Sequence, residues 1–194
     1  MLKIEMNSDK VNEILEKYKD ESNNIPVCIS RAINRTLEMT KTEMIRTANK
    51  KYTVKSSKLR NSINIFKSNK RNLNGSVVAS GKSIGLDHFK LSPKVRIKRK
   101  RILKVEIIRG DIKMLPHSFI AYRNGRLGAF ERTGHFREIP GKRKMIRKET
   151  IRRLLSTSEP QMLGQKDTIS YLQGYAEDKF IDRLIHEIER GIDD

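Results

Sequence analysis

Two stretches of the chain carry apolar residues at the three- and four-residue spacing of an amphipathic helix. The first begins near Pro26, a first-turn proline, and continues to Lys50. The second is capped by Asp167 or Thr168 and stopped by Gly191. Their apolar faces comprise Ile29, Ile33, Leu37, Thr40, Met44 and Ala48 in the first helix, and Ile169, Leu172, Ala176, Phe180, Leu184 and Ile188 in the second. Shorter helices are predicted after Ser8 and from Ser56 or Ser57 to Asn61.

Between the two long helices, the apolar period changes to the alternation of strands. Strands are predicted around Ile63 and Ile65 and over 76–80, where the residues are β-branched or small and bounded by Asn and Gly. Further strands are predicted over 95–97 and 103–107, each with one dry and one charged face. Further on, two apolar runs at 119–122 and 127–130 flank Asn124-Gly125, a dipeptide that tolerates the positive φ angles of a tight turn. This pattern predicts a β-hairpin that ends at Gly134. The basic stretch 141–153 has weak helical periodicity and predicts a loop with one helical turn.

The order of helices, strands and a final helix predicts an α+β fold, with the long helices packed on a mainly antiparallel β-sheet. The length of 194 residues suits a single domain over 1–194. We expect its parts to be a helical extension at 1–24, a helical scaffold at 25–62, a sheet region at 63–140, a basic loop at 141–164 and a C-terminal helix at 165–192.

The charge is unevenly distributed along the chain, whose formal net charge is +19. Residues 51–155 hold 29 basic and 6 acidic side chains, whereas residues 156–194 hold 4 and 9. A basic block beside an acidic end suits nucleic acid, an acidic protein surface, or the acidic end of another copy. The residues expected to face a neighbouring subunit or DNA are Lys98, Arg99, Lys100, Arg101, Lys142, Arg143 and Lys144. With only 6% aromatic residues the core is thin, so self-association is expected.

Candidate chemistry is sparse in this sequence. Ser80-Gly81-Lys82-Ser83 resembles the end of a phosphate-binding loop, but the position that needs the first glycine holds Ser76. Asp87 and His88 are adjacent, and on a strand adjacent side chains point to opposite faces and do not meet. We therefore expect no catalytic residue and no enzyme activity.

No cofactor or metal site is expected either. His117, His135 and His186 lack a ligand at metal-binding spacing and fit a solvated surface. Cys28 is the only cysteine and lies in an apolar stretch, which predicts a buried, inert thiol. No apolar run is long enough to span a bilayer and the first residues do not resemble a secretory signal, so no membrane partner is expected and the chain is expected in the cytoplasm.

Two segments resemble the phage minor tail protein Z family, a group of tail-completion proteins of phages and prophages. They are SFIAYRNGRLGAFERTG at 118–134 and IRRLLSTSEPQML at 151–163. The long helix with the KYTVKSSKLRNSI that follows, and RLIHEIERGI near the end, add weaker matches. Leu155, Ser156 and Thr157 depart from the family pattern, and 141–150 has no counterpart in it. The positions that carry the resemblance, expected to be structural, are Phe119, Tyr122, Gly128, Phe130, Glu131, Arg132, Gly134, Pro160, Gln161 and Met162.

The resemblance implies a non-enzymatic tail-completion or neck subunit. Such a subunit is expected to form a hexameric ring at the head-proximal end of the tail. Its partners would be copies of itself, a tail terminator, the tube or head-tail connector proteins, with DNA in the lumen. It would reside in the virion or phage-tail-like particle, and in the host cytoplasm during assembly. The alternative is a free, sequence-nonspecific nucleic-acid-binding protein that uses the basic block 51–155. A hydrolase or nuclease is the third possibility, but paired carboxylates and metal-ligand spacing are missing.

Overall fold

The structure is a computed structural model, and it describes residues 13, 16, 25–95, 102–140 and 145–193. Of the expected helical extension at 1–24, only Glu13 and Glu16 are described, as exposed helical residues. The expected strand at 95–97 falls outside the described residues except for Val95. All seven expected contact residues also lie outside the described residues. They are Lys98, Arg99, Lys100, Arg101, Lys142, Arg143 and Lys144.

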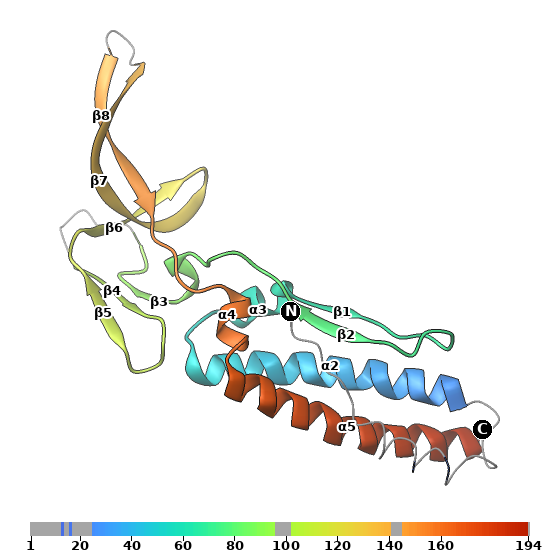
Figure 1. Ribbon diagram of the computed structural model, residues 1–194. Coiled ribbons are helices and arrows are strands. Elements are labelled where there is room, and N and C mark those ends of the chain that lie inside the picture. The colour runs from blue at the N-terminus through green and yellow to red at the C-terminus, as the bar shows by residue number, and fades with distance from the viewer. Residues whose placement is uncertain (1–12, 14–15, 17–24, 96–101, 141–144, 194) are drawn as a thin grey trace. The chain divides into compact units, whose positions relative to one another are not determined.

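The predicted α+β fold is confirmed, and every sheet among the described residues is antiparallel. Figure 1 labels the elements. The helices are α2 (Ile25–Lys51), α3 (Ser56–Ser62), the short 3-10 helix η1 (Leu86–His88), α4 (Glu159–Leu163) and α5 (Lys166–Asp193). The strands are β1 (Ile63–Phe66), β2 (Ser76–Ala79), β3 (Lys90–Ser92), β4 (Leu103–Glu106), β5 (Ile112–Leu115), β6 (Ser118–Arg123), β7 (Arg126–Pro140) and β8 (Met145–Arg153).

The chain divides into two compact units. The first unit comprises Met1–Ala48, Leu59–Gly81 and Glu159–Asp194, and the second comprises Asn49–Lys58 and Lys82–Ser158. The apolar spacing along a sequence predicts each helix and strand separately. It does not tell which elements share a core, so the division was not visible in the pattern.

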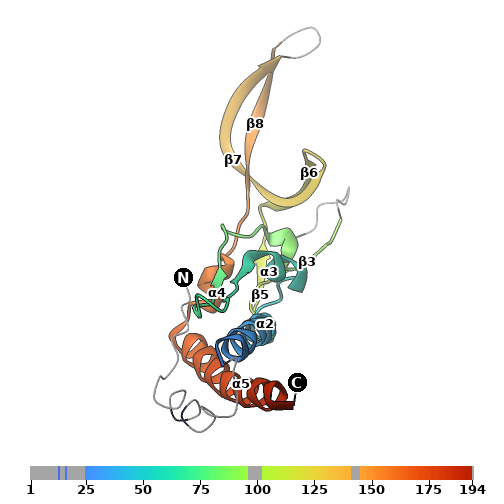
Figure 2. The same cartoon turned by 90° about the vertical axis from the view of Figure 1, so that its right-hand side faces the viewer.

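The first unit is built on α2 and α5, which run side by side in both views (Figures 1 and 2). All six apolar-face positions predicted for α2 are buried, and so are five of the six for α5, with Ile169 half-buried. The Tyr171 hydroxyl donates a hydrogen bond to Glu43 Oε1 at 3.0 Å and thereby joins α5 to α2. This hydrogen bond raises the pKa of Tyr171. The helix α5 runs two residues beyond Gly191, the predicted stop.

The two-stranded sheet β1-β2 lies against α2 in the same unit. Lys41 donates from Nζ to the Ile63 carbonyl at 2.5 Å, and the Ser68 amide donates to Asn34 Oδ1 at 2.9 Å. Gly75 allows the close approach, because a Cβ atom there would lie 2.7 Å from Leu37 Cδ1. The helix and this sheet therefore share one apolar core.

The second unit contains two three-stranded sheets, with the orders β3-β4-β5 and β6-β7-β8. The predicted tight turn between β6 and β7 is confirmed, since Arg123 pairs with Arg126 across two residues. Asn124 has a φ angle of 51° and Gly125 one of 72°, the positive values that such a turn requires.

Beyond this turn, the sequence prediction was wrong in two respects. The hairpin does not end at Gly134, because β7 continues to Pro140. The expected basic loop contains a strand, β8, which pairs with β7 along its length. Gly134 has a φ angle of 76° and lies where the register shifts between Arg132 and Phe136, as in a β-bulge. A glycine that commonly terminates a strand instead lets this strand continue with a bend.

Two alanine substitutions should change stability in opposite directions. Gly134→Ala should lower the free energy of unfolding of the second unit by about 1 kcal/mol, because an L-residue is strained at positive φ.

Gly174→Ala should raise the free energy of unfolding of the first unit by about 0.5–1 kcal/mol, because Gly174 is helical with open space around it. Urea unfolding monitored by circular dichroism measures both. Equal effects of the two substitutions would contradict the assigned backbone conformations.

Candidate functional site

The residues that carry the family resemblance divide between the two units. Seven of them lie on β6 and β7 in the second unit, whereas Pro160, Gln161 and Met162 lie on α4 in the first. Met162 is buried, and Gln161 is exposed. The two segments therefore serve separate cores.

On β6 and β7 the resemblance residues form one packed cluster. The Phe119 and Phe130 ring centroids are 6.3 Å apart, and Arg132 lies over the Phe119 ring at 5.5 Å. Gly128 is buried, and a Cβ atom there would lie 2.9 Å from the Phe130 ring. Tyr122 is not packed in this cluster, with 64% of its surface exposed. These residues hold the strands together and leave one aromatic side chain free to contact a partner.

Charged pairs reinforce the ribbon where β7 leaves β6. The ladder between β6 and β7 ends at Glu131, after which β7 pairs only with β8 among the described strands. Glu131 forms an ion pair with Arg152, and Arg132 contacts Glu149 at 2.9 Å. Glu149 also accepts a hydrogen bond from the Gly134 amide at 3.1 Å. This network stiffens the ribbon at its bulge.

The outer part of the ribbon, residues 136–140 and 145–149, is here named the arm. Figure 1 shows it extending beyond β6 as a twisted pair of strands. Three of its apolar side chains are exposed, with values of 53% for Phe136, 55% for Met145 and 48% for Ile146. Arg147 lies over the Phe136 ring at 4.6 Å. A two-stranded ribbon with exposed apolar side chains is marginally stable alone and suits contact with another surface.

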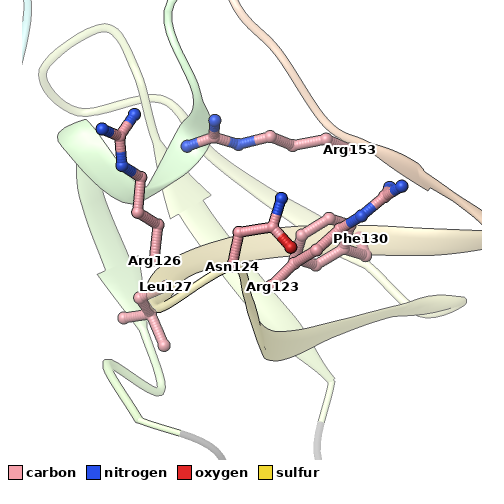
Figure 3. Close-up of a pocket in the computed structure, with 6 residues that line it drawn as sticks. All are labelled: Arg123, Asn124, Arg126, Leu127, Phe130 and Arg153. Atoms are coloured by element: carbon pink, nitrogen blue, oxygen red, sulfur yellow. The ribbon is translucent and has the colours of Figure 1, made fainter.

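A second feature of the same unit is a basic pocket of about 560 Å³. Its charged lining comprises Lys55, Lys58, Arg126 and Arg153 together with Asp87 and His88. A neighbouring hollow shares Arg126 and Arg153 and adds Arg123 (Figure 3). No sequence pattern indicated this pocket, because its cations are far apart in the chain and none belongs to a dense basic cluster.

The prediction that Asp87 and His88 do not meet was wrong. They lie on η1 and not on a strand, and His88 Nε2 is 3.5 Å from Asp87 Oδ2. Asp87 also binds Arg153, whose Nη2 donates to Oδ1 at 2.8 Å. Desolvation by burial lowers the pKa of His88 below 6.5, Asp87 acts in the opposite direction, and the charges of Lys58, Lys55 and Arg153 lower it further.

The depressed pKa of His88 makes the folded protein sensitive to mild acid. Because the unfolded chain takes up this proton more readily, stability is lost as the pH falls below about 6.5 towards the folded pKa. His88→Gln should therefore lose less stability than the wild type between pH 7.5 and pH 5.5. Urea midpoints at the two values measure this. The pKa of Glu106 is also lowered, chiefly by its hydrogen bond from Lys90. This group changes the stability only below about pH 4.5, which is outside the range from pH 7.5 to pH 5.5.

The remaining candidate residues are peripheral or buried. His117, His135 and His186 are exposed, and Cys28 is buried, as predicted. Among the described residues, no cluster of three His, Cys, Asp or Glu side chains is arranged to hold a metal ion. In that part of the chain no helix has the length and apolar character needed to cross a membrane.

The chain was compared with known protein families, curated proteins and solved structures. No protein-family model, no curated protein and no solved structure matches the chain.

Proposed function

We propose that this chain is a structural, non-enzymatic subunit of a phage tail or phage-tail-like particle. It forms a ring at the head-proximal end of the tail and joins or caps the tube. Its partners are copies of itself and the adjoining tail terminator, tube or connector proteins. The resemblance of 118–134 and 151–163 to the minor tail protein Z family supports this proposal.

The exposed arm is the structural feature that most supports the proposed ring. Its two strands have only each other as strand neighbours among the described residues, and its apolar side chains are exposed. An enzyme or a self-sufficient binding domain gains nothing from such a ribbon, which is an aggregation hazard when it is unpaired. In a ring the same ribbon is covered by the next subunit, and its apolar surface stabilises the assembly.

Charge supports a contact between copies. The arm presents Arg137, Arg147 and Lys148 as exposed cations, with Glu138 as an exposed anion. On α5, Asp178, Asp182 and Glu189 are exposed carboxylates. A basic arm on one copy and an acidic helix on another are complementary, which favours association and sets its orientation.

Sedimentation velocity of the purified chain at increasing concentrations tests the proposal. A closed species of one fixed stoichiometry, visible as rings by negative-stain electron microscopy, is the expected result. A chain that stays monomeric at every concentration and is also absent from purified particles contradicts it.

A second candidate function is sequence-nonspecific binding of nucleic acid, which the basic pocket favours. It requires an affinity for duplex DNA that falls steeply with salt, with a logarithmic slope of about −0.9 for each phosphate contact. Gel-shift titrations at two salt concentrations separate the candidates. Tight, salt-sensitive binding by a monomer favours the nucleic-acid function over the ring.

A further inference from the structure

We propose that the basic pocket of the second unit is a binding site for a phosphate group, held by Lys55, Arg126 and Arg153. This inference does not depend on the proposed ring, because every residue that forms the pocket belongs to the second unit. The pocket is large enough for a phosphate group and open to solvent at the exposed side chains of Lys55 and Arg126.

The fold brings the cations together from separate parts of the chain. Lys55 precedes α3, Lys58 lies in its first turn, Arg126 begins β7 and Arg153 ends β8. These four cations face one carboxylate, that of Asp87. Like charges gathered at one place repel each other, so the arrangement costs free energy in the empty protein and is relieved by a bound anion.

Arg153 is held in position before any ligand binds. Its Nη2 donates to Asp87 Oδ1 at 2.8 Å, and two glycines leave it space. A Cβ atom on Gly85 would lie 2.7 Å from Arg153 Nη2, and one on Gly128 would lie 3.3 Å from Arg153 Nε. Because the guanidinium is already oriented, binding costs little side-chain entropy.

Arg126 and Lys55 supply cations that no described carboxylate neutralises. Figure 3 shows the guanidinium groups of Arg126 and Arg153 extending into the same space. Among the described residues, no carboxylate lies within ion-pair distance of Arg126 or Lys55. Their charges are therefore available to a ligand.

The chemistry of the pocket fits phosphate better than a carboxylate. One arginine fork satisfies a planar carboxylate, whereas a tetrahedral phosphate accepts hydrogen bonds from several directions and carries more charge. Lys55, Arg126 and Arg153 come from three separate segments of the chain, which suits a tetrahedral group. Phe130, which lines the neighbouring hollow, is only 2% exposed and offers a nucleotide base no surface for stacking.

Binding of inorganic phosphate to the full-length chain tests the site directly. The proton signals of the His88 imidazole, followed by NMR across a pH series, report on the pocket itself. Desolvation is the largest cause of the lowered pKa of His88, and Lys58, Lys55 and Arg153 lower it further. A bound phosphate should raise the pKa of His88, because its negative charge offsets these three cations. Isothermal titration calorimetry gives the affinity in parallel.

The test variant is Lys55→Gln with Arg126→Gln, and the matched control is Lys70→Gln with Arg71→Gln. The control removes one lysine and one arginine from the exposed loop between β1 and β2, so the net charge changes equally. The pocket variant should bind phosphate at least about tenfold more weakly than the control. Gly85→Ala, which fills the space beside Arg153, should weaken binding without changing the net charge.

Binding of a labelled DNA duplex to the pocket variant and to the control distinguishes a nucleic-acid phosphate from a free phosphate. If the pocket holds a nucleic-acid backbone, the pocket variant loses about one unit of salt slope for each contact removed and the control does not. If duplex binding is the same in both while inorganic phosphate binding differs, the site takes a free phosphate. Equal phosphate affinity in the two variants, or no change in the pKa of His88, overturns the proposal.

Discussion

Replacing residues 137–148 with Asn-Gly should leave the second unit folded and prevent the chain from entering particles. Phe136 and Glu149 are partners across the ribbon, so a two-residue turn between them closes a hairpin in register. The described residues that are lost are mostly exposed, so the melting temperature should change by only a few degrees. Incorporation into particles, measured by mass spectrometry in a complemented producing strain, should fall by about tenfold or more, because the proposed ring uses the arm as the contact between subunits.

Two further variants separate the arm from general surface effects. Ile146→Glu keeps the ribbon but places a charge on its apolar surface, and it should also reduce incorporation. Lys70→Glu with Arg71→Glu changes an exposed loop of the first unit and should assemble normally. If the shortened arm assembles as well as the wild type, the arm is not the contact between subunits.

Phe180→Ala should cause the largest loss of stability of any single change considered. Phe180 is 2% exposed in the core of the first unit, on the buried face of α5. Truncation of a buried phenylalanine removes its transfer free energy and leaves a cavity, at a cost of about 3–5 kcal/mol. Calorimetry should show the melting temperature lowered by about 10 °C.

Asp178→Ala is the matched control for this prediction, since Asp178 is exposed on the same helix. Its effect should stay within about 0.5 kcal/mol. Similar losses for the two substitutions would mean that α5 does not bury Phe180 against a core.

The long helices were predictable because their apolar positions repeat at the helical period over many turns. In α2 every predicted apolar-face position from Ile29 to Ala48 is buried. The turn at Asn124-Gly125 was predictable for a local reason, because few dipeptides tolerate two successive positive φ angles.

The arm was not predictable from the sequence, because each of its two strands pairs only with the other among the described strands. A strand with exposed residues on both faces shows no apolar alternation, and β8 therefore resembles a charged loop in the sequence. The basic pocket was hidden for a different reason. Lys55 and Arg153 are separated by about half of the chain and meet only through the tertiary fold.

Electron cryo-microscopy of particles that contain this protein tests the central proposal most directly. The account predicts a closed ring of this chain at the head-proximal end of the tail, with the arm of each copy seated on its neighbour. Density for the chain at the baseplate, or along the tube without ring closure, would contradict it.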